Sequence, residues 1–190
     1  MRVVIAGGHG QIALRLTKIL AADGHEVVGL VRNPEHGADI ARAGGQAAVL
    51  DLEKTDLDSV VDVLSGADVA IFSAGAGPGS GVERKKTVDK VDDRDPNDTF
   101  TVYLAAKKAA EDDLRSRDLD WTILRPGGLT NDPGTGKVLL EDKTGYGRIS
   151  RDDVALVLAG LCSTAASIGR TLELIAGDTP VDEALANLAR

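Results

Sequence analysis

Tyr103 and Lys107 have the residue types and the spacing that acid–base chemistry needs. They lie four residues apart in a segment that reads YLAAK, and on a helix this spacing puts both side chains on one face. A tyrosine hydroxyl can protonate or deprotonate a substrate oxygen when a nearby cation lowers its pKa from about 10 toward neutrality. We therefore predict Tyr103 as the acid or base and Lys107 as the assisting cation. The alternative is an amphipathic helix with a tyrosine at the core edge and a lysine extending into solvent.

A helix over residues 100–116 is predicted to carry this pair. At about 100° per residue, Ala110 and Leu114 fall close to Tyr103 on the helical wheel, and Lys107 falls within the same stripe. We expect this stripe to face inward.

A glycine-rich turn near the first residue has the pattern of a phosphate site. Gly7, Gly10 and Ala13 form G-x-x-G-x-x-A after the apolar run at 2–6, and a helical pattern begins at about Gln11. Glycine permits a tight turn and a close phosphate, and a helix amino end favours an anion. The alternative is a turn that binds nothing. The residues predicted to bind a dinucleotide here are Gly7, His9, Gly10, Gln11 and Ile12, with His9 interpreted as a turn residue rather than a catalyst.

Arg32 is predicted to select the cofactor. The second strand, residues 26–31, ends in Leu30-Val31-Arg32, where enzymes that use NAD usually place a carboxylate for the ribose 2′-hydroxyl. A guanidinium fork suits a 2′-phosphate instead. We therefore favour NADP (NADPH) over NAD, with a solvated loop arginine as the alternative.

Three further strand ends are expected to border the same site. Asp51 and Leu52 follow the strand at 46–50, where Asp51 either lies beside the adenine or caps a turn. A glycine-rich stretch follows the strand at 68–73, and ligands of open α/β sheets bind outside such carboxyl ends; a flexible turn is the alternative. The residues expected to line the cofactor site from these later segments are Ala74, Gly75, Ala76, Pro126 and Gly127, together with Lys107.

The order of elements predicts the fold class. Strands and helices alternate through the first 73 residues, which indicates an α/β fold with a doubly wound parallel sheet and helices on both faces. A strand at 120–125, the loop at 129–136 and a helix beginning near Arg151 follow. We predict a single dinucleotide-binding domain over 1–190, with a small substrate-side portion at about 126–150.

Composition limits the possible partners. The net charge is −8 with a pI near 4.9, which argues against a nucleic-acid surface and against a basic membrane patch. Cys162 is the only cysteine, so we expect a buried thiol in a reducing cytosol and no internal disulfide. The histidines have no grouping that suggests a metal site. No leader pattern or long apolar run is present, and we predict a cytoplasmic protein with a small-molecule substrate.

The segments that carry these features resemble a known family. They read VVIAGGHGQIALRLTKIL, GHEVVGLVRNP, FSAGAGPGSG, YLAAKKAAEDDLRSRDLDWTILRPGGLT and GRISRDDVA. Together they are similar to the atypical short-chain dehydrogenase/reductases (SDR), in the branch with NmrA-like and NAD-dependent epimerase-like members. The resemblance implies a Rossmann fold that binds NADP and reductase, dehydrogenase or epimerase chemistry where Tyr and Lys are both present.

The chain departs from this family in one place. The family has a crossover helix and a fifth strand, which usually ends in the catalytic Ser or Thr, before the tyrosine helix. Only a charged stretch stands between Gly81 and Phe100, and no apolar run there could form both elements. We predict a Rossmann-like sheet that lacks the usual fifth strand, with about 25 to 30 residues absent near Lys90. Either the gene lacks them or the sequence joins two segments of a longer chain.

Three functions follow as hypotheses. The first is an NAD(P)-dependent oxidoreductase or epimerase that acts on a small carbonyl or sugar-like molecule. The second is a non-catalytic, NmrA-like NADP sensor or regulatory protein. The third is a flavin or tetrapyrrole reductase, in which Tyr103 is not needed.

Overall fold

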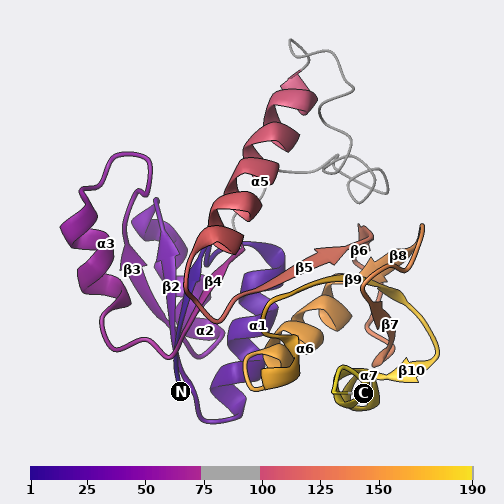
Figure 1. Ribbon diagram of the computed structural model, residues 1–190. Coiled ribbons are helices and arrows are strands. Elements are labelled where there is room, and N and C mark those ends of the chain that lie inside the picture. Colours follow the sequence, from indigo (N-terminus) through magenta and orange to yellow (C-terminus); the bar gives the residue numbers. More distant parts are fainter. Residues whose placement is uncertain (74–98, 190) are drawn as a thin grey trace. The chain divides into compact units, whose positions relative to one another are not determined.

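A computed structural model describes residues 1–73 and 99–189, with the backbone alone for 99–104. The chain divides into two units, Met1–Ala76 (unit 1) and Gly77–Arg190 (unit 2). Each unit has its own four-stranded sheet (Figure 1).

The sheet of unit 1 is entirely parallel, in the order β3-β2-β1-β4. Its central strand carries Val3, Val4 and Ile5, which are at most 1% exposed because both faces are covered. The bounds of its strands are β1 Arg2–Ala6, β2 Glu26–Val31, β3 Gln46–Val49 and β4 Val69–Phe72, as the periodicity predicts.

Helices cover both faces of this sheet, so the predicted doubly wound α/β fold is confirmed. The helices are α1 (Gln11–Ala22), α2 (Gly37–Arg42, after the 3-10 turn η1 at Pro34–His36) and α3 (Leu57–Leu64). Figure 1 shows α3 on the opposite side of the sheet from α1. The side chain of Ile40 in α2 lies against Gly29, whereas α3 packs on the face that carries Val4, Val28 and Leu30.

The inward face of α3 is rotated from the predicted one. The sequence predicts a stripe of Leu57, Val60, Val61 and Leu64, but Leu57 is 75% exposed and Val61 54% exposed. Val63 and Leu64 make the core contacts. A helix this short has two candidate apolar stripes one residue out of phase, and the packing selects the later one.

Strand β4 carries an exposed aromatic side chain. Phe72 is 69% exposed; its register with Ala6 puts it on the same face as Val4, which α3 covers. In a doubly wound sheet the crossover helix after such a strand covers this position. The segment near Lys90 lies outside the described residues.

Unit 2 contains a mixed sheet in the order β10-β7-β9-β5. Strands β5 and β9 are parallel, whereas β7 runs antiparallel to β9 and β10 antiparallel to β7. A separate two-stranded ladder joins β6 to β8. The bounds are β5 Thr122–Pro126, β6 Gly128–Thr130, β7 Lys137–Glu141, β8 Arg148–Ser150, β9 Arg170–Ala176 and β10 Thr179–Pro180.

Three α-helices of unit 2 lie within the described residues: α5 (Thr99–Ser116), α6 (Arg151–Leu161) and α7 (Val181–Asn187), with a 3-10 turn η3 at Ala165–Ser167. Ser150 caps α6, because its hydroxyl accepts the Asp153 N–H at 2.9 Å. Among the described helices, none is long and apolar enough to span a bilayer.

Two glycines allow the first turn of unit 1 to lie directly on β2. The N–H of Gly8 donates to the carbonyl of Leu30 at 2.9 Å. A Cβ atom added to Gly8 would lie 2.5 Å from the Cα of Gly29. Position 8 therefore requires glycine, and the turn after β1 depends on this backbone contact.

We predict that Gly8→Ala destabilises the protein, because the new methyl group has no space against the β2 backbone. The expected loss is about 3 kcal/mol of unfolding free energy, as for other overpacked sites. Gly37→Ala is the matched control, because its Cβ would meet the Cβ of Ala47 at an ordinary 3.5 Å. Urea unfolding of both variants measures the difference. Equal stability of the two would contradict the close approach.

Candidate functional site

The glycine turn of unit 1 has the geometry of an anion site. Gly7 has a φ of 80°, and the N–H of Gly10 donates to its carbonyl at 2.9 Å, which closes the turn. The backbone bonds of α1 begin with the N–H of Leu14 on the carbonyl of Gly10, so the N–H groups just before it have no acceptor within the helix. Gly10 has no capping side chain, and no acidic residue stands in the first turn. A diphosphate fits here.

The other residues of the turn have separate structural roles. Ala13 is fully buried, as the helix–sheet contact of the predicted motif requires. Gln11 is exposed and Ile12 half-buried, so both lie where a ligand can reach them. Gly8 and Gly29 were not predicted from the sequence; the available signal was a lone glycine inside the apolar strand EVVGLV.

Arg32 is accessible at the carboxyl end of β2. Its side chain is 70% exposed and lies 3.6 Å from the Glu53 carboxylate, which is 77% exposed. An ion pair this exposed contributes little free energy and is easily replaced. The guanidinium is therefore available to a more strongly charged partner.

Asp51 caps the turn after β3. Its Oδ1 accepts the N–H of Glu53 at 3.1 Å, and its Oδ2 lies 3.6 Å from the Lys54 ammonium. Of the two readings made from the sequence, the capping role is seen directly. Contact between an adenine and Asp51 or the 41% exposed Leu52 stays a prediction.

His9 bonds to the first residues of α2. Its Nε2 lies 2.7 Å from Oδ2 of Asp39, and its ring stacks on that of His36. Asp39 also pairs with Arg42. The hydrogen bond from His9 is the main cause that holds the pKa of Asp39 below its usual value; partial burial opposes it, and the nearby cations add to it.

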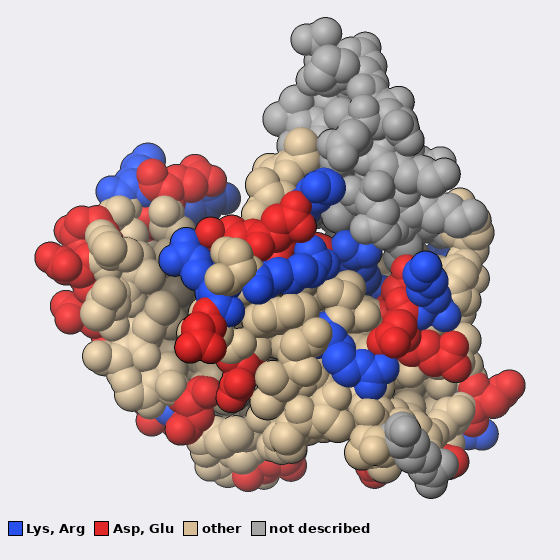
Figure 2. All heavy atoms as spheres, in the orientation of Figure 1, with Lys and Arg blue, Asp and Glu red and all other residues tan. Residues whose placement is uncertain are grey.

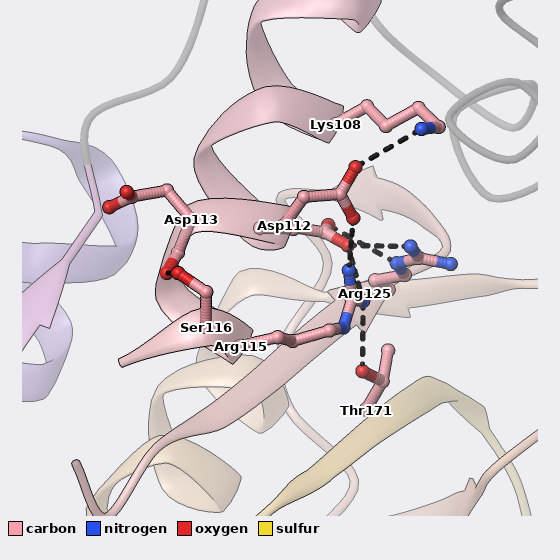
Figure 3. A network of polar contacts seen from close by, with 8 residues as sticks. Lys108, Asp112, Asp113, Arg115, Ser116, Arg125 and Thr171 are labelled. Atoms are coloured by element: carbon pink, nitrogen blue, oxygen red, sulfur yellow. Dashed lines mark hydrogen bonds and ion pairs between the residues drawn. The ribbon is translucent and has the colours of Figure 1, made fainter. Parts of the chain in front are cut away.

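Two partly buried charges join α5 to the sheet of unit 2 (Figure 3). The Arg125 guanidinium of β5 lies 2.6 Å from the Glu111 carboxylate, with side chains 13% and 16% exposed. Arg115 also donates to Glu111 at 2.8 Å and to Thr171 of β9 at 3.1 Å. A partly buried arginine needs such partners. The sequence signal for this contact was an arginine within the apolar strand WTILRP.

This contact sets which face of α5 points toward the sheet. Lys107 lies one turn before Glu111, and Tyr103 one turn before Lys107, so the three share one side of the helix. Lys107 is half-buried, whereas Ala110 is exposed. The prediction that Ala110 faces inward is therefore wrong, because the ion pair turns α5 toward the Glu111 side. The side chain of Tyr103 lies outside the described residues.

Pro126 and Gly127 lie where β5 leaves its sheet. The N–H of Gly127 donates to the carbonyl of Leu174 at 2.8 Å, and a Cβ atom at this position would collide with the carbonyl of Gly147. Local packing alone thus demands glycine at 127. Contact of either residue with a cofactor stays a prediction, and the predicted Ala74, Gly75 and Ala76 lie outside the described residues.

A buried carboxylate holds the loop predicted to border the substrate. Asp153, 2% exposed, accepts the N–H groups of Thr135 and Gly136 at 3.0 and 2.8 Å. The Ser150 hydroxyl donates to it at 2.9 Å. The loop is therefore anchored to the amino end of α6 by charge-assisted hydrogen bonds.

Acidic and basic side chains lie next to one another on the face that Figure 2 shows. Exposed ion pairs also occur between neighbouring turns of the chain, as between Arg117 and Asp113 at 2.8 Å. Within the parts of the chain that the structure describes, no group of three or more His, Cys, Asp or Glu side chains could hold a metal ion.

Comparison with known proteins identifies the family. The family model described as NAD(P)H-binding matches residues 7–94 and 80–165. The uncharacterized sugar epimerase YhfK of Bacillus subtilis is 31% identical, and the alignment covers 99% of this chain and all of the relative. That alignment has 215 positions, 25 more than the 190 residues of the chain, so YhfK has residues that this chain lacks.

Solved structures give the same result. A Bacillus halodurans protein, provisionally described as an NAD-dependent epimerase/dehydratase, is 31% identical with a TM-score of 0.81, covering 98% of this chain and 99% of that one. The anaerobillin reductase ChuY of Escherichia coli O157:H7 shares the fold, with 22% identity, a TM-score of 0.71, and coverage of 94% and 98% of the two chains. The chain therefore belongs to the NAD(P)H-binding Rossmann-fold family of atypical short-chain dehydrogenase/reductases.

Proposed function

We propose that this protein binds NADP(H) in preference to NAD(H) and is an oxidoreductase or epimerase for a small carbonyl or sugar-like molecule. The observation that carries the proposal is Arg32, which stands accessible at the carboxyl end of β2. The names of YhfK and of the Bacillus halodurans structure support the reaction class.

The Arg32–Glu53 pair bears on the choice of cofactor. A protein that selects NAD places a carboxylate at the end of β2 to accept the ribose 2′-hydroxyl. The nearby carboxylate in this chain, Glu53, comes from the turn after β3 and already engages the guanidinium. A 2′-phosphate offers Arg32 two parallel, charge-assisted hydrogen bonds, which are stronger than the exposed pair.

Tyr103 and Lys107 would perform the acid–base step. The nicotinamide ring, when bound, donates or accepts hydride. Tyr103 would exchange a proton with the substrate oxygen, and Lys107 would stabilise the phenolate that results. The Glu111–Arg125 contact supports this assignment, because it directs the side of α5 that carries both residues toward β5.

Two other functions do not need the full set of catalytic residues. One is hydride transfer to a planar acceptor, and the other is NADP binding without catalysis. The observation that favours them is the shorter chain, which lacks at least 25 positions of the alignment with YhfK. If these are the crossover helix and fifth strand, the catalytic Ser or Thr of the family is absent as well. A flavin or tetrapyrrole reductase would need neither that residue nor Tyr103.

Replacing Arg32 tests the cofactor preference. Because Arg32→Ala removes a charge-assisted contact to the 2′-phosphate, the Kd for NADPH should rise roughly 10- to 100-fold while that for NADH stays nearly constant. Calorimetric titration measures both. Arg117→Ala removes another exposed, ion-paired arginine and should change neither Kd. Equal losses for the two cofactors in Arg32→Ala would refute the assignment.

Replacing Tyr103 tests the chemistry. Tyr103→Phe removes the proton donor and should lower NADPH-dependent reduction of an aldehyde, a quinone or a keto-sugar about 100-fold or more, with the Kd for NADPH unchanged. Arg117→Ala, which removes an exposed ion pair with Asp113 just after the same helix, should keep full activity. Turnover that survives in Tyr103→Phe would indicate a planar-acceptor reductase. Tight NADPH binding with no carbonyl reduced by the wild type would indicate a sensor.

A further inference from the structure

Two histidine rings lie face to face beside the glycine turn of unit 1. The ring centroids of His9 and His36 are 3.6 Å apart and their planes differ by 7°. His9 belongs to the turn after β1, and His36 to η1, which follows β2. Both side chains are half-buried, so a ligand at this edge of the sheet can reach them.

One carboxylate serves this stack directly. Asp39 accepts from His9 at 2.7 Å and also pairs with Arg42. Because the pKa of Asp39 is held below its usual value, first by the hydrogen bond from His9, this carboxyl is ionised at neutral pH. The charged residues on the elements around the stack are Arg15, Lys18, Arg32, Glu35, Asp39, Arg42, Asp51, Glu53 and Lys54.

The stack can carry two positive charges only when another anion is present. Two imidazolium rings at this separation repel each other, and the single negative charge of Asp39, already shared with Arg42, faces both rings. The other carboxylates have partners of their own: Glu53 lies beside Arg32, Asp51 beside Lys54, and Glu35 accepts from Asn33. A charge on His36 would therefore need a ligand that brings its own anion.

The position of the stack indicates which anion. The pyrophosphate of a dinucleotide lies at the turn after β1, and its adenosine ribose lies at the end of β2. His9 and His36 follow those two strand ends. The 2′-phosphate is the group at that ribose that distinguishes NADP from NAD.

We propose that the His9–His36 stack contacts the 2′-phosphate of NADP(H) and that His36 takes up a proton when this phosphate binds. The inference rests on the proposed preference for NADP. Since the bound state holds an extra proton, NADPH affinity must rise as the pH falls through the range where histidine titrates. NADH has no 2′-phosphate and should show no such change. The 2′-phosphate itself loses a proton near pH 6, which acts in the opposite direction and cannot mimic the effect.

Calorimetric titrations of NADPH and NADH at about pH 6.5 and about pH 8.5 test the proposal. The preference for NADPH over NADH should fall roughly tenfold as the pH rises between these values, because the uptake of a fraction of a proton is linked to NADPH binding. Titrations at about pH 7.5 in two buffers that differ in ionisation enthalpy should show proton uptake with NADPH and none with NADH.

His36→Gln keeps a hydrogen-bond donor but cannot gain a proton, so its preference for NADPH should no longer fall as the pH rises through this range. The matched control is His25→Gln. His25 precedes β2, at the opposite end of the strand, where it lies 3.3 Å from the amino group of Met1. This variant should behave as the wild type does.

The role of His36 and the preference for NADP can fail separately in these experiments. No preference for NADPH at either pH would refute the cofactor assignment, and the stack's role with it. A preference that is constant with pH and occurs without proton uptake would leave the cofactor assignment intact and overturn the role of His36. Wild-type pH dependence in His36→Gln would overturn that role as well.

Discussion

The backbone contact between Gly8 and Gly29 is the constraint on which the proposed cofactor site of unit 1 depends. Because a Cβ at Gly8 would lie 2.5 Å from the Gly29 backbone, only a glycine allows the turn after β1 to rest on β2. That contact places the amino end of α1 at the carboxyl edge of the sheet. The accessible N–H groups there and Arg32 after β2 then border one region, which is where the family binds its dinucleotide.

In unit 2 an ion pair between β5 and α5 fixes the position of an element in a comparable way. Arg125 and Glu111 are largely removed from solvent, where either charge alone would be costly. Their pairing sets the rotation of α5 and so the side of the helix on which Lys107 lies. Strand β5 therefore carries more than packing residues, since one of its side chains orients the helix that bears the proposed acid–base pair.

The sequence predicted the elements well because strong periodic patterns determine them. The strands of unit 1 and the helices at α1, α5 and α6 follow from apolar spacing, glycine stops and the Ser150 cap. The stripe of α3 could not be predicted, since two apolar registers compete in a short helix and only packing against Val4 and Leu30 decides between them. The Glu111–Arg125 pair joins residues from two separate elements, which spacing along one helix cannot reveal. Strands β6 and β8 have three residues each, too few for a periodic signal.

We propose that the turn between β1 and α1 binds the phosphates of NADPH. Titration of ¹⁵N-labelled protein with NADPH, followed by its backbone amide resonances, measures this contact. We predict that the signals of Gly8, Gly10, Gln11 and Ile12 shift most, since their N–H groups form or adjoin the anion site. Saturable binding that leaves these four signals unchanged would show that the phosphates bind elsewhere.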